Sequence, residues 1–204
     1  SKAMSIEQIQ KALYPIAGSF SGRVDKEMTT FTGMIHKDRW RTFLGMVLPQ
    51  LLEPGFRESD FTRLKDAQLN ALIQNLRSNN EEELGKERLQ TNIFKGTPYG
   101  HVSLGTVAGI TAVTLDDVKN FAKMMYTRAN LTIGLSGDVP EDMWTSLRAA
   151  LGALPEGPAA VKPVVHASRA AGIDVEILEK DTRATAISFG FPIDVTRAHP
   201  DFAA

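Results

Sequence analysis

The stretch KGTPYGHVSLGTVAGITAVTLDDVKNF, from Lys95 to Phe121, is the most informative part of the chain. A Pro-Tyr-Gly-His turn leads into an uncharged run that is punctuated by glycine and ends at Thr114. Glycine and proline predict an irregular loop here. Thr114 and Asp117 have the spacing of a reciprocal cap, which predicts that a helix begins directly after the loop. The loop raises one question first, namely whether His101 has a chemical role.

His101 does not belong to any known catalytic or metal-binding motif in this sequence. None of the four histidines has another histidine three or four positions away, and neither H-E-x-x-H nor H-x-x-E-H occurs. The chain also lacks a G-x-S-x-G elbow, a P-loop and a G-x-G-x-x-G fingerprint. Scattered histidines are most simply surface residues, so the sequence predicts a structural role for the loop. The histidines are His36, His101, His166 and His199.

Composition excludes several classes of protein. The chain has 204 residues, of which 43% are hydrophobic and 23% charged, as expected for a globular protein rather than a disordered one. Its net charge of -1 gives no basic footprint for nucleic acid. No apolar stretch reaches the roughly 18 residues of a membrane-spanning helix. The chain has no cysteine, which excludes disulfides and thiolate chemistry.

Location is less constrained by the sequence. Ser1-Lys2-Ala3-Met4 is polar and lacks a signal-peptide pattern, so either export is absent or the start of a precursor has been removed. A chain without cysteine fits an oxidising compartment as easily as the cytosol. We expect a periplasmic or secreted location in preference to a cytoplasmic one.

Upstream of the loop, the hydrophobic pattern alternates between helical and strand-like. Ser5 and Gln8 predict a capped helix that runs to Ala17, and 20–35 predicts two strands joined by a turn at VDKE. Apolar residues at helical spacing predict a helix after Asp38. A long helical region is expected from about Glu58 to Phe94, with a break near Asn79-Asn80.

Downstream of the loop, the pattern predicts the capped helix, a buried strand over Asn130 to Gly137, and a helix after Asp138. The proline-rich residues 157–172 are typical of a linker, and IDVEILEK and TAISFGFPI follow as strand-like runs. Helices and strands are segregated rather than alternating. The predicted class is therefore α+β, with an antiparallel or mixed sheet and helices packed on one face.

Several motifs together resemble the pitrilysin family of zinc metallopeptidases, which includes insulin-degrading enzyme and the mitochondrial processing peptidase. Members typically show H-P-Y-G or similar, then L-G-T, a threonine-capped helix, an R-x-N strand and G-D-V. The resemblance covers about residues 4 to 155 and makes 1–156 a peptidase-like domain. It makes 173–204 either the start of a second homologous domain or strands that complete the first sheet. The loop residues that match are Pro98, Tyr99, Gly100, His101, Leu104, Gly105 and Thr106, and the later matches are Arg128 to Leu131 and Gly137-Asp138-Val139.

The resemblance also implies where the metal site of an active member would lie. In that family two histidines and a distant glutamate hold zinc, and the glutamate inside H-x-x-E-H is the general base. That motif would lie upstream of the segment at Met4. The third ligand is expected near Ala71 and a further acid near Leu64, but neither residue is acidic, and Asp66 lies on a different helical face from Ala71. The resemblance therefore implies no catalytic residue and no zinc ligand in this chain, with zinc expected only in a catalytic partner.

Three functions remain open at this level. The first is a catalytically inactive peptidase-like domain that helps to form a peptide-binding chamber with a homologous catalytic domain or subunit. The second is a fragment of an active zinc metalloendopeptidase whose H-x-x-E-H motif lies outside this chain. The third is a structural or assembly subunit. The expected partners are the catalytic homologue and an extended peptide, with a homodimer possible through exchange of the strands after Gly172.

Overall fold

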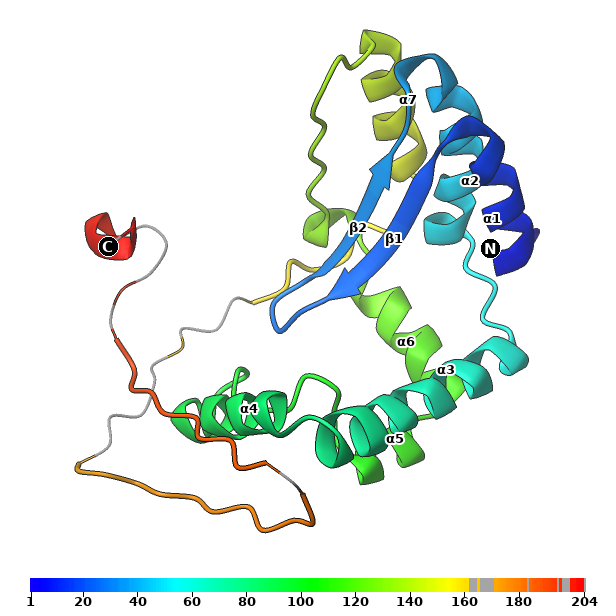
Figure 1. Cartoon of the computed structure of the whole chain (residues 1–204). Helices are drawn as coiled ribbons and strands as arrows, with labels where there is room; N and C mark the ends of the chain where they lie inside the picture. Colours follow the sequence, from blue (N-terminus) through cyan, green and yellow to red (C-terminus); the bar gives the residue numbers. More distant parts are fainter. Residues whose placement is uncertain (162–164, 166–170, 183, 194, 196–198, 204) are drawn as a thin grey trace. The chain divides into compact units, whose positions relative to one another are not determined.

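The computed structural model describes residues 1–161, 165, 171–182, 184–193, 195 and 199–203 (Figure 1). The chain divides into two compact units, Ser1–Leu64 with Ala112–Lys162 and Lys65–Thr111 with Pro163–Ala204. The elements are helices and one small sheet, so the predicted α+β class is confirmed. In chain order they are α1 Ile6–Leu13, η1 Tyr14–Ile16, β1 Ser19–Val24, β2 Thr29–Met34, η2 Lys37–Arg39, α2 Trp40–Leu52, α3 Glu58–Asn70, η3 Ala71–Ser78, α4 Glu81–Ile93, α5 Val107–Ala112, α6 Leu115–Met125, η4 Arg128–Asn130, α7 Glu141–Leu151 and η5 Pro200–Ala203.

Helix starts follow the predicted caps. The Ser5 hydroxyl accepts from the Gln8 N–H, and the Gln8 side chain accepts from the Ser5 N–H at 2.8 Å. Thr114 and Asp117 form the same reciprocal cap on α6. The predicted extension of α1 to Ala17 is wrong, since α1 ends at Leu13 and a 3₁₀ turn comes next. Pro15 has no N–H to continue the α-helical ladder, which explains the early end.

The core of the first unit lies between α1, α2 and α7. The hairpin β1–β2 covers one side of it, pairing antiparallel with Phe20 opposite Gly33 (Figure 1). The Phe20 ring meets the Phe43 ring edge-on at 6.5 Å. A Cβ on Gly33 would lie 2.6 Å from the Phe43 ring, so glycine allows this close approach of strand and helix. The buried core residues are Ile9, Leu13, Trp40, Phe43, Leu44, Val47, Leu147 and Leu151.

The strand predicted over Asn130 to Gly137 is wrong. This stretch begins in the short turn η4 and continues without strand structure, although Ile133 packs against the core. Strand structure requires ladder hydrogen bonds to a neighbour. The sheet of the described residues contains β1 and β2 alone, and the ladder does not extend to this stretch.

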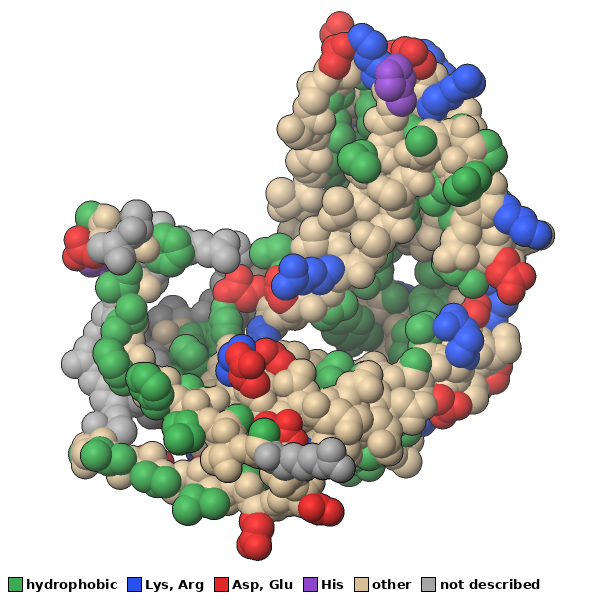
Figure 2. All heavy atoms as spheres, in the orientation of Figure 1, with side chains coloured by type: hydrophobic (Ala, Val, Ile, Leu, Met, Phe, Trp, Pro, Cys, Tyr) green, Lys and Arg blue, Asp and Glu red, His purple; other side chains and the backbone are tan. Residues whose placement is uncertain are grey.

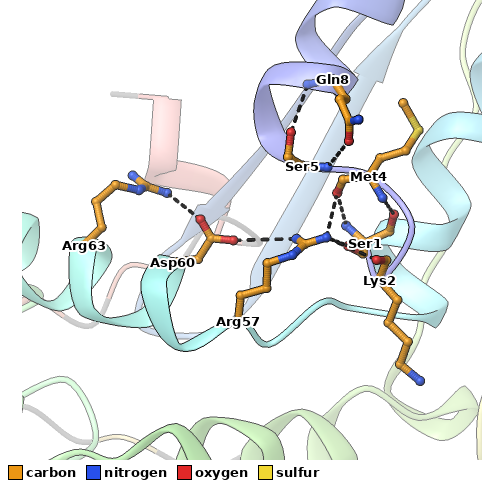
Figure 3. Close-up of polar contacts among 8 residues, drawn as sticks. All are labelled: Ser1, Lys2, Met4, Ser5, Gln8, Arg57, Asp60 and Arg63. Carbon is orange, nitrogen blue, oxygen red and sulfur yellow. Dashed lines mark hydrogen bonds and ion pairs between the residues drawn. The ribbon is translucent and has the colours of Figure 1, made fainter.

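The first four residues are held by one arginine (Figure 3). The Arg57 guanidinium donates to the carbonyl oxygens of Ser1 at 2.8 Å, Lys2 at 3.2 Å and Met4 at 3.4 Å. Asp60 lies 3.7 Å from the same guanidinium and orients it from the first turn of α3. Burial, and then the nearby Arg57 charge, lower the pKa of the Ser1 α-amino group. Arg57 thus joins the start of the chain to the start of α3.

Residues of the R-x-N motif anchor the segment that comes after α7. The Arg128 N–H donates to the Pro155 carbonyl at 2.8 Å, and the Asn130 side chain accepts from the Ala160 N–H at 2.6 Å. The Asn130 side-chain amide also donates to the Met125 carbonyl at 3.2 Å, at the end of α6. One asparagine therefore connects α6 with the beginning of the predicted linker. The part of that linker at 162–164 and 166–170 lies outside the described residues.

Thr127, directly before this motif, carries a buried hydroxyl that has no hydrogen-bond partner among the described residues. Its side chain is packed against Gly157. An unsatisfied buried hydroxyl costs free energy, so we expect Thr127→Val to raise the free energy of unfolding by about 1 kcal/mol. Chemical denaturation checks this. Thr145→Val is the control, because the Thr145 hydroxyl is exposed and donates to the Glu141 carbonyl. A loss of stability in Thr127→Val would contradict the expectation.

Among the described residues, none of the helices combines the length and the apolar character that a bilayer crossing requires.

Candidate functional site

The loop between α4 and α5 starts with a tight turn that requires glycine. The Gly100 N–H donates to the Thr97 carbonyl at 3.0 Å, and the Tyr99 ring lies 5.8 Å from the Phe94 ring. A Cβ on Gly100 would lie 2.3 Å from the Phe94 carbonyl oxygen, which is closer than van der Waals contact allows. Pro98 fixes one backbone angle inside the same turn. His101 comes next as an exposed residue.

Side chains of α3 and α4 that belong to the second unit hold the rest of the loop. From α3, the Gln68 side chain donates to the Leu104 carbonyl of the loop at 2.9 Å, and the Lys65 ammonium donates to the Thr111 carbonyl of α5, the helix that follows the loop, at 2.7 Å. From α4, the Glu87 carboxylate accepts from the Ser103 N–H at 3.2 Å and from its hydroxyl at 3.1 Å. Long side chains on neighbouring helices thus satisfy the backbone of a loop that has no regular structure.

The L-G-T part of the loop leads into α5. Gly105 has a backbone φ of +85°, a value that favours glycine, and the Thr106 hydroxyl accepts from the Gly109 N–H at 3.0 Å. The Leu104 side chain packs on the core of this unit. That core consists of buried Leu72, Leu76 and Ile110, with Leu69, Leu84, Val102, Leu104 and Val107 packed around it.

Ala71, where a zinc-ligating glutamate is expected, is the first residue of η3, a π-helical segment that directly continues α3. The next residue, Leu72, is 1% exposed and points into the core. The sequence has no acidic residue between Asp66 and Glu81. Among the described residues, no three or more histidine, aspartate or glutamate side chains converge where they could hold a metal ion. The described residues therefore do not fit a zinc site of the expected composition.

The structure also brings together residues that the sequence analysis did not single out. The two runs predicted as strands, 173–180 and 185–193, are extended and lie on α4, but they form no sheet in the described residues. We call residues 173–182 and 184–193 together the C-terminal ribbon. Its first run is antiparallel to α4, because Glu176 contacts Arg88 and Asn92 near the end of the helix, and Lys180 contacts Glu81 at its start.

Polar side chains attach the ribbon to α4 and η3. The Glu176 carboxylate accepts from Arg88 at 3.2 Å and from Asn92 at 2.6 Å. The Lys180 ammonium forms an ion pair with Glu81 at 3.0 Å and donates to the carbonyl oxygens of Arg77 and Ser78, the last residues of η3. The sequence indicated these contacts only through the even-numbered polar residues of the strand-like run, because alternate residues of a strand share one face.

The apolar residues at odd-numbered positions of the ribbon form a row on the face opposite α4. Ser188 and Gly190 face α4, as shown by their contacts with Gly85 and Leu89. The odd-numbered side chains are largely exposed, and Figure 2 shows hydrophobic groups along this part of the surface. An open depression of about 520 Å³ lies beside the second run, lined by Glu82, Lys86 and Leu89 of α4 and by 185–189. The apolar row consists of Ile173, Val175, Ile177, Ile187, Phe189, Phe191 and Ile193.

Acid should release the ribbon from α4. Hydrogen bonds from Thr182 and then Lys180 lower the pKa of Glu81 to about 2, and those from Arg88 and Asn92 lower the pKa of Glu176. A carboxylate with a lowered pKa stabilises the attached state fully above its ordinary value near 4.5, and this contribution disappears as the pH falls towards 2. We therefore expect the ribbon to detach between about pH 4.5 and pH 2.

Fluorescence anisotropy measures this detachment, because the cysteine-free chain can be labelled at one introduced site, Asp181→Cys. The anisotropy should fall over this pH range. At pH 7, Glu81→Gln should already lower it. Glu179→Gln is the control, since the Glu179 side chain is exposed and has no ion pair among the described residues. An anisotropy that is constant from pH 7 to pH 2 would contradict the attachment.

Known proteins with similar sequences come from one family. Residues 112–204 match the family described as Peptidase M16 inactive domain. The non-peptidase homolog YmxG of Helicobacter pylori is 30% identical over 158 residues, which are 76% of this chain and 36% of that protein. A probable mitochondrial-processing peptidase subunit beta of Arabidopsis thaliana is 21% identical over 68% of this chain and 26% of its own length.

A solved structure has the same fold. The peptidase M16 inactive domain from Pseudomonas fluorescens superimposes with a TM-score of 0.70 and 24% sequence identity, over 78% of this chain and 39% of that one. The chain thus spans about a third of the length of the relatives that it matches.

Proposed function

This chain belongs to the peptidase M16 (pitrilysin) family and is a peptidase-like domain of its inactive type, and from this premise we propose that it forms one wall of a peptide-binding chamber. A homologous catalytic domain or subunit supplies the other wall and the zinc ion. The chain itself contributes binding surface and no catalytic group.

The position of Ala71 is the observation that carries the proposal. An alanine methyl group cannot ligate a metal ion, and the neighbouring Asn70 and Leu72 offer no carboxylate either. The helix around this position is intact, with Leu72 buried and the adjacent loop tied to α3 and α4. A domain that keeps this architecture but has no metal ligand at that position fits a role in binding rather than in hydrolysis.

The extended ribbon supports the peptide-binding part of the proposal. A β-strand with unpaired backbone groups can bind another extended chain by backbone hydrogen bonds, and a row of apolar side chains adds affinity. In the part of the chain that the structure describes, residues 185–193 of the ribbon have both features. A similar protein, the one from Arabidopsis thaliana, is named as a subunit, which supports a chain that works beside another.

Zinc binding and peptide hydrolysis test the catalytic part of the proposal. Calorimetric titration of zinc into the chain should show no tight one-to-one site, and the chain alone should not hydrolyse an unstructured, internally quenched peptide. Ala71→Glu should behave in the same way, because one carboxylate without partner histidines does not make a zinc site. A tight one-to-one site accompanied by hydrolysis would instead identify the chain as part of an active metalloendopeptidase.

Peptide affinity tests the binding part. The chain is mixed with a zinc-bearing homologue from the same genome, and the anisotropy of a labelled unstructured peptide is measured with either protein and with both. The mixture should bind the peptide more tightly than the homologue alone and hydrolyse it faster. If the peptide binds to neither the chain nor the mixture, the chain is a structural or assembly subunit.

A further inference from the structure

We propose that residues 155–160 are a releasable latch, which docks on the turn η4 in one state and detaches from it in another. The latch sets how much chain separates the first unit from the point where the C-terminal ribbon attaches to α4. This inference goes beyond the proposed function and does not rest on it. It starts from the contacts of the segment after α7, which we call the latch segment, and from one buried hydroxyl group beneath it.

Three hydrogen bonds hold the latch segment on η4 among the described residues. Two successive N–H groups of η4 donate to two successive carbonyl groups of the segment, at 2.8 Å and 3.1 Å. They pair Arg128 with Pro155 and Ala129 with Glu156. At the other end of the segment, the Ala160 N–H donates to the Asn130 side chain at 2.6 Å. One short turn therefore holds both ends of the latch segment.

Gly157 allows the middle of the segment to lie directly on Thr127. The backbone φ of Gly157 is +59°, in the left-handed region that favours glycine. A Cβ at this position would lie 2.4 Å from the Thr127 Cγ2 and 2.9 Å from the Thr127 hydroxyl oxygen. The backbone of the segment and the threonine side chain are thus too close for any side chain at position 157.

The docked state leaves one polar group unsatisfied. Thr127 is 2% exposed, and its hydroxyl has no hydrogen-bond partner among the described residues. A hydroxyl that is buried without a partner loses its hydration and gains no hydrogen bond in exchange. Movement of Gly157 away from Thr127 uncovers this hydroxyl to water. The docked state therefore carries a free-energy penalty that the detached state does not.

Little apolar packing offsets this penalty. Leu154 packs against the core of the first unit, whereas each residue from 155 to 160 is exposed. The ion pair between Glu156 and Arg128, at 3.7 Å, also lies at the surface and adds little. Segments that are held by a few backbone hydrogen bonds, without buried side chains, open locally at low cost in free energy. The latch segment can therefore detach while α7 and the core stay folded.

Detachment changes the length of chain between two attachments. With the segment docked, the chain is held to the first unit as far as Ala160, and it is held to α4 again at Glu176. After detachment, the last residue that is held to the first unit is Leu154, which packs in its core. Release of 155–160 then adds up to about 20 Å of extended chain between the two attachments.

Hydrogen exchange, followed by NMR in the 204-residue chain, measures the opening of the latch. The docking N–H groups belong to Arg128, Ala129 and Ala160. They should share one opening equilibrium, because the segment detaches as a unit, and they should exchange faster than the core amides of α7. Three unrelated degrees of protection, or protection as high as in α7, would overturn the proposal.

Two substitutions should shift this equilibrium in opposite directions. Thr127→Val removes the unsatisfied hydroxyl, so it should lower the opening equilibrium about fivefold and slow the exchange of all three N–H groups alike. Gly157→Ala places a methyl group against Thr127, so it should raise the opening equilibrium about tenfold or more.

Gly96→Ala is the matched control for Gly157→Ala. Gly96 also has a left-handed φ, of +80°, but nothing lies within 4 Å of its Cβ position. The backbone strain of alanine is thus present in both variants, and the clash with Thr127 is present in one. Gly96→Ala should leave the exchange of the three docking N–H groups unchanged. An equal effect of the two variants, or no effect of Gly157→Ala, would contradict the latch.

Substitutions of Asn130 separate the docking contact from a second contact of the same side chain. Asn130→Asp keeps an oxygen that accepts from the Ala160 N–H, but it loses the amide that donates to the Met125 carbonyl at 3.2 Å. Asn130→Ala loses both contacts. The opening equilibrium should therefore rise several times in Asn130→Ala and change little in Asn130→Asp. Equal opening in the two variants would show that the Met125 contact governs this segment and would overturn the latch.

Proteolysis after Glu156 gives an independent readout. A glutamate-specific protease requires detached chain on both sides of its cleavage site, so the rate of cleavage follows the population of the open latch. Fragment masses distinguish this cleavage from those after other glutamates. Cleavage after Glu156 should be faster in Asn130→Ala than in the parent chain and slower in Thr127→Val. Equal rates in all three proteins would overturn the proposal.

Discussion

Replacing Gly100 with alanine is expected to lower the free energy of unfolding by about 2–3 kcal/mol. The new methyl carbon would lie 2.3 Å from the Phe94 carbonyl oxygen and 2.8 Å from the carbonyl carbon. Both are backbone atoms, so no side-chain rotation relieves the clash, and the turn between α4 and the loop must move. Urea denaturation monitored by circular dichroism measures the loss.

Gly134→Ala is the matched control for this substitution. Gly134 also lies outside regular structure, but its backbone is not in the left-handed region and nothing lies within 4 Å of its Cβ position. Alanine there should leave the stability unchanged or raise it slightly, because it restricts the unfolded chain. Equal stabilities of Gly100→Ala and Gly134→Ala would show that the turn is not as tight as the structure has it.

The second large effect is expected at Leu72. Its side chain is 1% exposed and lies in the centre of the core formed with Leu76 and Ile110. Truncation to alanine removes buried apolar surface and leaves a cavity, which costs about 2–5 kcal/mol. Hydrogen exchange of the amides in η3 and α5 should accelerate accordingly, because this core joins the two elements.

Ile73→Ala is the control for Leu72→Ala. The two residues are adjacent, both are branched hydrocarbons, and both lie in η3, but Ile73 is 37% exposed. Its truncation should cost less than half as much, since less surface leaves the core. A comparable loss in both variants would mean that burial is not what distinguishes these positions.

Local signals in the sequence predicted the helices well. Ser5 with Gln8 and Thr114 with Asp117 form the caps that their spacing indicates, and the break near Asn79-Asn80 falls between η3 and α4. At that break the Asn80 side chain accepts from the Glu83 N–H at 3.1 Å. These features depend on residues three or four positions apart, which a single sequence displays directly.

Strand predictions failed where a strand needs a distant partner. The runs 130–137, 173–180 and 185–193 have β-prone composition, yet none of them pairs in the described residues, because strand structure is a property of two segments together. The attachment of Glu176 and Lys180 to α4 was missed for the same reason. Those contacts join residues far apart in the chain, and only the alternation of polar and apolar residues hinted at them.

The family resemblance identified more of the site than motifs alone. It assigns the position of a zinc-ligating glutamate to Ala71, a residue that belongs to no motif. The structure adds that this alanine is where α3 changes to the wider helix of η3. The role of the loop residues in any partner complex stays a prediction, since the contacts that hold the loop are within one unit.

The π-helical segment has a consequence for how this chain is aligned with its relatives. A π-turn holds one residue more than an α-turn, so a helix that contains one can absorb a single-residue insertion without redirecting the next segment of the chain. Matching this helix to that of a relative by counting forward from α3 can therefore differ by one residue from matching by counting backward from Ser78. The two counts begin to differ at Ala71. The disagreement leaves the chemistry unchanged, because Asn70, Ala71 and Leu72 all lack a carboxylate. A shift of this helix by one residue therefore places no metal ligand at the expected position. Only a substitution would introduce one.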